Sequence, residues 1–117
     1  MAGESKLERD CCDYATGEGC KNYKWRSRGN AGVTDRFFVL PGGTVIFVEF
    51  KAPDETGRLS ALQKTEIEEL QDLGAPVYIC VNFEWFKKML SFYLGRSHMK
   101  IPENSVFACA VERERGC

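Results

Sequence analysis

The chain has 117 residues, of which 44% are hydrophobic and 28% are charged. This balance is typical of one globular domain and excludes a disordered chain, a collagen-like repeat and a coiled coil. The longest apolar runs, such as 77–81, are too short to cross a bilayer. Sixteen basic and seventeen acidic residues give a net charge of −1, a total that taken alone argues against a nucleic-acid-binding protein.

The first residues carry neither the basic nor the apolar segment of a signal peptide, which predicts an intracellular protein. In a reducing compartment the six cysteines are expected to be free thiols. No two cysteines have the C-x-x-C spacing and His98 is the single histidine, so the sequence does not predict a zinc site.

A basic segment follows a predicted N-terminal helix over residues 5–15. Residues 20–36 are rich in Gly and Asn, which favours a loop or an irregular strand. Five basic residues against one acid give this segment a local charge of +4: Lys21, Lys24, Arg26, Arg28 and Arg36. We expect these side chains to contact DNA phosphates, unless the segment is a solvated loop that balances acidic helices. Tyr23 and Trp25 lie among them and could stack on bases, or pack in the core or at a dimer interface.

Two strands are predicted over 35–40 and 44–51, joined by Pro41-Gly42-Gly43. Both strands are apolar on both faces, so the sheet should be covered on both sides. A three-residue loop places Asp35 opposite Glu49, whereas a two-residue loop sends Glu49 to the other face. We predict the three-residue loop, because odd-length hairpin loops favour glycine in a left-handed conformation.

The second half of the chain is predicted to form a helix, a strand and a second helix. Residues 60–63, Ser-Ala-Leu-Gln, form a capping box that opens a helix, which we expect to run to Leu73 and stop at Gly74. A third strand is predicted over 75–81 and should run parallel to the strand before the helix. The last predicted helix covers 84–94.

Asp35, Glu49 and Lys51 form the group with the clearest chemical meaning. Two facing carboxylates repel each other unless a cation lies between them. Oxygen ligands without a nearby His or Cys suit a hard cation such as Mg²⁺ or Mn²⁺. An adjacent lysine can position the attacking water and neutralise a transition-state phosphate, so the group indicates metal-assisted phosphodiester hydrolysis. The plainer alternative is a solvated acid pair on the strands, with Arg36 and Lys51 as its salt-bridge partners.

An ordered set of motifs extends beyond these three residues: Gly32-Val-Thr-Asp-Arg36, Gly42-Gly43, Phe47-Val-Glu-Phe-Lys-Ala-Pro53, Leu59-Ser, Gln63 and Gly74. The set resembles the VRR-NUC (virus-type replication-repair nuclease) domain, a branch of the PD-(D/E)xK nuclease superfamily, over residues 4–95. Thr34 stands where the family has proline, and threonine also keeps an extended backbone. The resemblance implies a restriction-endonuclease-like α/β fold, a mixed central β-sheet flanked by α-helices. It also implies a nuclease domain over 1–96, which leaves 97–117 as a C-terminal extension whose residues 106–111 could form an edge strand.

Carried over residue by residue, the resemblance implies site roles for matched positions. The catalytic residues would be Asp35, Glu49, Lys51 and Gln63. The metal ligands would be Glu8, Asp35, Glu49 and the backbone carbonyl of Phe50. The implied cofactor is Mg²⁺, with Mn²⁺ as a substitute.

The resemblance further implies a metal-dependent endonuclease acting on structured DNA, with no nucleotide cofactor and no membrane partner. Family members that consist of this domain alone, many from phages and bacteria, resemble homodimeric junction-resolving enzymes. We therefore expect a homodimeric four-way (Holliday) junction resolvase in a bacterial or phage-infected cytoplasm. A flap or end-processing repair nuclease, and a non-catalytic DNA-binding module of the same fold, are the alternatives. Sequence-specific restriction is disfavoured because no separate sequence-reading element is present.

Overall fold

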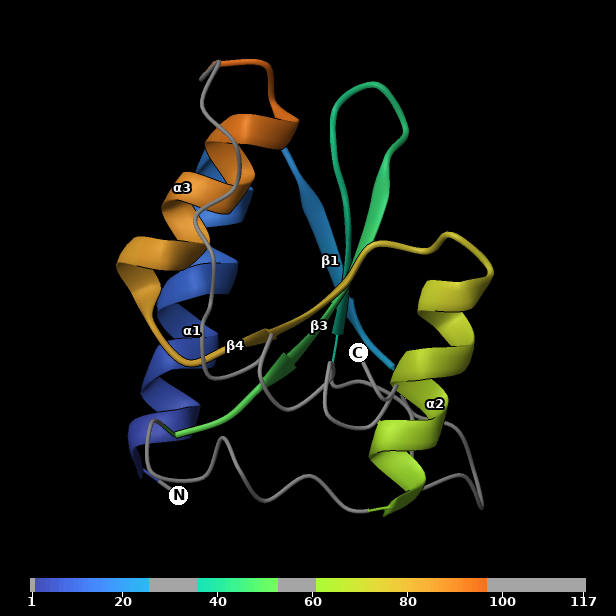
Figure 1. Ribbon diagram of the computed structural model, residues 1–117. Coiled ribbons are helices and arrows are strands. Elements are labelled where there is room, and N and C mark those ends of the chain that lie inside the picture. Colours follow the sequence, from blue (N-terminus) through green and yellow to red (C-terminus); the bar gives the residue numbers. More distant parts are fainter. Residues whose placement is uncertain (1, 26–35, 53–60, 97–117) are drawn as a thin grey trace.

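A mixed four-stranded sheet with helices on both sides forms the part of the chain that the computed structural model describes, residues 2–25, 36–52 and 61–96 (Figure 1). In chain order the elements are α1 (Ala2–Gly17), β1 (Lys21–Lys24), β2 (Arg36–Val39), β3 (Val45–Phe50), α2 (Ala61–Asp72), β4 (Val77–Cys80) and α3 (Phe83–Tyr93). The strands lie in the order β1-β2-β3-β4, and only β3 and β4 are parallel. This confirms the predicted fold class and the parallel connection through α2.

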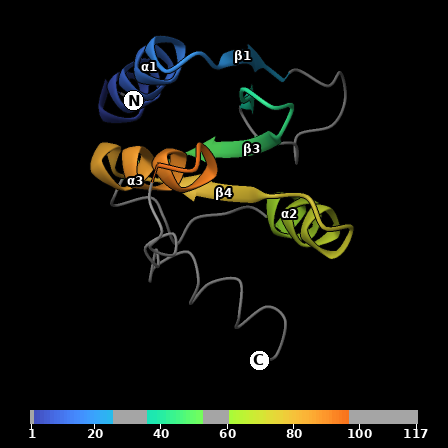
Figure 2. The ribbon, with the colours of Figure 1, turned by 90° about the horizontal axis from the view of Figure 1, so that it is seen from above.

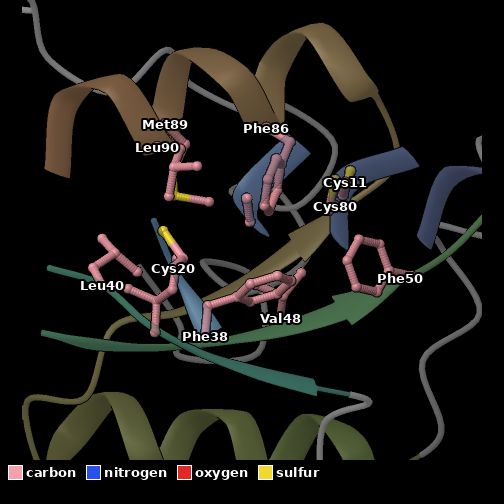
Figure 3. Packing of buried hydrophobic residues seen from close by; sticks show 12 residues of the cluster. Cys11, Cys20, Phe38, Leu40, Val48, Phe50, Cys80, Phe86, Met89 and Leu90 are labelled. Carbon is pink, nitrogen blue, oxygen red and sulfur yellow. The ribbon is translucent and has the colours of Figure 1, made fainter. Parts of the chain in front are cut away.

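The helices divide between the two faces of the sheet, as the apolar strands predict. Figure 2 shows α1 and α3 on one side and α2 on the other. The larger core lies between the sheet and the α1–α3 side (Figure 3) and contains, among others, Phe38, Val48, Phe50, Cys80 and Phe86. On the other side, Ile67 of α2 packs against β4 in a second, smaller cluster.

The β2–β3 hairpin has the predicted register. Arg36 pairs with Val48, so the numbers of paired residues sum to 84. The Leu40 amide donates to the Thr44 carbonyl at 2.8 Å and closes a loop of three residues. Gly42 and Gly43 in that loop have φ of 97° and 95°, which glycine adopts at little cost. Asp35, the residue before β2, lies outside the described residues.

The boundaries of the other elements differ modestly from the predictions. The helix expected over 5–15 extends over Ala2–Gly17. The segment expected as a loop or an irregular strand begins as a regular edge strand, β1, which pairs antiparallel with β2. Gly74 follows α2 with φ of 90°, as expected of a glycine that ends a helix. Residues 97–117, including the strand proposed over 106–111, lie outside the described residues.

The described helices are short compared with a membrane-spanning helix. The longest, α1, has 16 residues. None of the helices in the described ranges is both long enough and apolar enough to cross a membrane.

Candidate active site

The candidate active site is built on β3, whose side chains alternate between the two faces of the sheet. Ile46, Val48 and Phe50 belong to the core on the α1–α3 side. Phe47 packs against the cluster beneath α2, so strand alternation puts Glu49 and the following Lys51 on the α2 face as well. One strand thus supplies both the core and the site.

Glu49 is the buried acid of this site, with only 4% of its surface exposed. The Gln63 amide of α2 donates to Glu49 Oε2 at 2.9 Å. The Lys51 ammonium nitrogen lies 3.5 Å from the same oxygen, and its side chain is 15% exposed. Burying a carboxylate is unfavourable unless its charge is compensated, and these two contacts provide that compensation. The structure therefore brings together three of the four predicted catalytic residues; the fourth, Asp35, lies outside the described residues.

The donors around Glu49 fit a hard divalent cation better than a soft one. The carboxylate of Glu49 and the backbone carbonyl of Phe50, the next residue along β3, are both oxygen donors. Neither Gln63 nor Lys51 brings an imidazole or a thiolate, the groups that favour zinc or copper. The Lys51 ammonium compensates the charge of the Glu49 carboxylate, so a further carboxylate brought to this site would require a cation.

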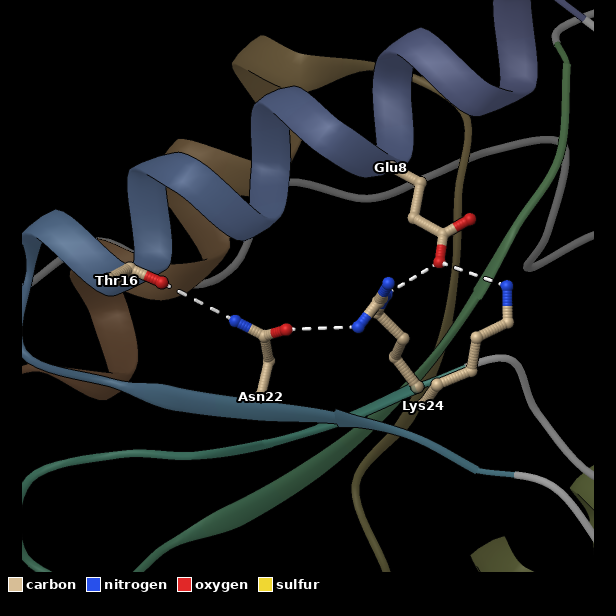
Figure 4. A network of polar contacts seen from close by, with 5 residues as sticks. Glu8, Thr16, Asn22 and Lys24 are labelled. Atoms are coloured by element: carbon tan, nitrogen blue, oxygen red, sulfur yellow. Dashed lines mark hydrogen bonds and ion pairs between the residues drawn. The ribbon is translucent and has the colours of Figure 1, made fainter.

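Glu8 lies in a second polar cluster (Figure 4). Its Oε2 accepts a hydrogen bond from Arg36 Nε at 2.5 Å and lies 3.8 Å from Lys24 Nζ. Arg36 NH1 also donates to Asn22 Oδ1 at 3.0 Å, and the Asn22 amide reaches the Thr16 hydroxyl at 3.5 Å. This chain of contacts joins α1 to β1 and β2.

The two polar clusters face opposite sides of the sheet. Arg36 pairs with Val48, the neighbour of Glu49, so the side chains of Arg36 and Glu49 point in opposite directions. Glu8 lies on the same side of the sheet as the Arg36 side chain, because α1 packs on the side that α3 covers. The role of Glu8 as a metal ligand stays a prediction, and the contacts of its carboxylate in this structure are to Arg36 and Lys24.

The predicted DNA-binding residues differ in exposure and in their contacts within the protein. Lys21 is exposed on β1. Lys24 and Arg36 contact Glu8, so their charge is partly engaged within the protein. Arg26 and Arg28 lie outside the described residues.

An open pocket of about 420 Å³ adjoins the Glu8 cluster; its lining consists of Glu8, Arg9, Cys12, Asp13, Lys24 and Arg36. Burial raises the pKa of Cys12 to about 11, although the nearby Arg36 opposes this shift. The thiol therefore stays protonated at neutral pH. A pocket lined by both acids and bases has no strong preference for an anion or a cation.

Tyr23 and Trp25, for which the sequence allows several positions, lie with Phe37 and Phe47 in a group of aromatic residues on the α2 face. The Tyr23 and Phe37 rings are stacked with centroids 5.3 Å apart, and Trp25 lies 5.3 Å from Phe47. The alternation of residues 21 and 23 along β1, continued by residue 25 just after its end, is the signal that could have placed them. Four strand residues with two lysines make a weak strand pattern, however.

Comparisons with known proteins agree with this fold. No protein-family model matches the chain. "Putative nuclease p44" of Acyrthosiphon pisum secondary endosymbiont phage 1 is 42% identical over 76 residues, which cover 65% of this chain and 80% of that protein. A solved structure described as a VRR_NUC domain superposes with a TM-score of 0.69 at 25% identity, covering 78% of this chain and 97% of the other. With this fold, this relative and an E-x-K strand beside Gln63, the chain belongs to the VRR-NUC family of nucleases.

Proposed function

We propose that the protein is a metal-dependent endonuclease for branched DNA, acting as a homodimer on four-way (Holliday) junctions. The observation that carries the proposal is the buried Glu49 carboxylate, held between Lys51 and Gln63 on a nuclease fold. A solvated pair of acids on a strand, the plainer alternative, does not describe a residue that is 4% exposed.

The residues that would hold the metal are Asp35, Glu49 and the backbone carbonyl of Phe50, with Mg²⁺ as the ion and Mn²⁺ as its substitute. Glu8 would join them only by leaving Arg36 and Lys24, its present contacts. When bound, the ion lowers the pKa of a coordinated water and stabilises charge on the phosphate.

Lys51 and Gln63 have separate roles in this proposal. The Lys51 ammonium lies next to Glu49 and can hold the attacking water and neutralise the charge that develops on the scissile phosphate. The Gln63 amide holds one oxygen of Glu49, which fixes the orientation of that carboxylate. The products would carry 5′-phosphate and 3′-hydroxyl ends.

Homodimerisation follows from the proposed substrate. A four-way junction needs two symmetrically placed cuts, and a two-fold dimer presents two identical sites. The phage relative and the solved domain support the nuclease activity; the branched substrate and the dimer are our proposal.

Replacing Lys51 with alanine tests the chemistry. We expect Lys51→Ala to lower the cleavage rate roughly 100- to 1,000-fold or more while DNA binding is largely retained, because the lost cation acts mainly on the transition state. Cleavage of labelled junctions with Mg²⁺ and binding by gel shift would measure the two effects. Lys88→Ala, at an exposed position on α3, is the matched control. Normal cleavage by Lys51→Ala with Mg²⁺ would contradict the mechanism.

A panel of labelled duplex, flap, splayed and four-way substrates, each with Mg²⁺ and then with EDTA, distinguishes the candidate activities. Paired symmetric nicks in the four-way substrate support junction resolution. Preferential cutting of flaps or ends would instead assign the repair-nuclease alternative. Binding without cleavage in either Mg²⁺ or Mn²⁺ would leave only a non-catalytic DNA-binding module.

A further inference from the structure

An aromatic ridge runs across the sheet on the same face as Glu49; we define it as Tyr23, Trp25, Phe37 and Phe47. Tyr23 pairs with Phe37, and Phe37 pairs with Phe47, so the three form one row across β1, β2 and β3. Trp25 meets this row edge-on at Phe37 and tilted at Phe47, with centroids 6.3 and 5.3 Å apart. The ridge is therefore a continuous set of ring contacts.

The ridge leads from the edge of the described sheet to the site. Phe47 lies two residues before Glu49 on β3, a separation of about 7 Å along a strand. Tyr23 lies two strands away from Phe47, which corresponds to about 10 Å across the sheet. These spacings put the outer end of the ridge within a short stretch of nucleic acid from the Glu49 carboxylate.

Exposure changes along the ridge. Phe47 is partly buried against the cluster beneath α2, and Phe37 is half-buried. Tyr23 is 47% exposed, the largest value among the aromatic side chains of the described residues. An aromatic ring that stacks on another ring and is still half exposed can accept a further planar group.

Charge beside Tyr23 favours a polyanion. Lys21 lies on the same face of β1 as Tyr23 and is exposed, while Lys24 lies on the opposite face with its side chain 47% exposed. An exposed lysine beside an exposed ring, here Lys21 beside Tyr23, is a combination by which proteins hold single-stranded nucleic acid, since the cation meets a phosphate and the ring meets a base.

We propose that the aromatic ridge is a stacking site for an unpaired DNA base, with Tyr23 as the contact residue. The proposal rests on the proposed nuclease function. It adds that the feature of branched DNA that the protein recognises is an unpaired base. A strand bound with a base on Tyr23 and phosphates beside Lys21 would continue along the ridge toward Glu49. In a fully paired duplex the bases are stacked on each other and are not offered to the ring.

Binding to a matched pair of DNAs tests this inference: a splayed duplex with unpaired arms and a continuous duplex of the same sequence, both measured by fluorescence anisotropy in EDTA. We expect Tyr23→Ala to weaken binding of the splayed DNA roughly 5- to 150-fold, the usual loss of one base–aromatic stack. Binding of the continuous duplex should change by less than about twofold. A 2-aminopurine placed in the unpaired arm should be quenched by the wild-type protein and not by Tyr23→Ala.

Three further variants separate stacking from folding. Tyr23→Phe should keep the affinity, because stacking does not need the hydroxyl. Tyr23→Leu preserves apolar contact with Phe37 but has no ring, so it should behave like Tyr23→Ala while unfolding at the wild-type urea concentration. Phe92→Ala removes another exposed aromatic, on α3, and should bind both DNAs normally.

Specific results would overturn the inference. Equal binding of splayed DNA by wild type and Tyr23→Leu, or an equal loss for both DNAs, would contradict a stacking site. If the wild-type protein is a dimer and the Tyr23→Leu variant is a monomer, the ridge is a contact between two copies of the chain and not a stacking site. A wild-type protein that neither binds nor cuts any DNA would contradict the proposed function itself, whereas normal cutting by Tyr23→Leu would contradict only the stacking site.

Discussion

Glu49 combines a burial that is unfavourable for folding with the central role in the proposed chemistry. Its carboxylate is almost completely removed from water, and the Lys51 ammonium nitrogen lies 3.5 Å away. A divalent cation bound to the same carboxylate would interact more strongly here than at the surface, because little water screens the charges. Metal binding should therefore be visible as a change in stability as well as in activity.

The first prediction at the residue scale concerns this linkage between metal and folding. Addition of Mg²⁺ should raise the thermal midpoint of the wild-type protein, by an amount that corresponds to about 2.7 kcal/mol when the free ion is at 100 times its dissociation constant. Glu49→Gln should lose this shift, because the neutral amide is a poor ligand. Glu84→Gln, at an exposed acid on α3, should keep it. A full Mg²⁺ shift in Glu49→Gln would show that the ion binds elsewhere.

At the scale of elements, the contacts of Arg36 hold α1 against the edge of the sheet. Its guanidinium donates to Glu8 on α1 and to Asn22 on β1, and it starts β2 itself. Lys24 contacts the same Glu8 oxygen from farther away, at 3.8 Å, and is more exposed. The two cations should therefore contribute unequally to stability.

Unfolding in urea would measure this difference. Arg36→Met should lower the free energy of unfolding by roughly 2–4 kcal/mol, because it removes two charge-assisted hydrogen bonds and leaves Glu8 half-compensated. Lys24→Met should cost less than about 1 kcal/mol, as is usual for an exposed ion pair. Equal losses in the two variants would contradict the inference that Arg36 joins the elements.

Some elements could be predicted from the sequence and one could not. The β2–β3 register followed from the glycines at 42 and 43, because loop length determines which residues pair. The parallel β4 followed from the intervening helix. β1 has the sequence Lys-Asn-Tyr-Lys, which has little strand propensity, and it is ordered by pairing with β2 along one edge.

At the scale of the whole molecule, some contacts of the candidate site could be predicted from the sequence and others could not. Glu49 and Lys51 share a face because a strand alternates strictly, so local sequence was sufficient to predict their proximity. The position of Glu8 depends on which face of the sheet α1 covers and on where that helix crosses it. Strand periodicity contains no information on that packing, so the Glu8–Arg36 contact could not be foreseen.

The oligomeric state is the prediction that belongs to this scale. Sedimentation equilibrium or light scattering should give about twice the chain mass of 13.2 kDa, because symmetric cutting of a junction requires two sites related by a two-fold axis. The measurement should be made at several concentrations, with and without a four-way substrate. A monomer under all of these conditions would contradict junction resolution and favour the flap or end-processing activity.

The alternation of β3 has one more consequence, which concerns how the protein can vary. Insertion or deletion of a single residue within Val45–Phe50 would exchange the inward and outward side chains, placing an acid in the core and Val48 or Phe50 in the site. Length changes in this strand should therefore be absent from functional variants. The Pro41–Gly43 loop should keep its length as well, because a two-residue loop would send Glu49 to the other face of the sheet. A screen for catalytic activity would select for a correctly folded strand at the same time.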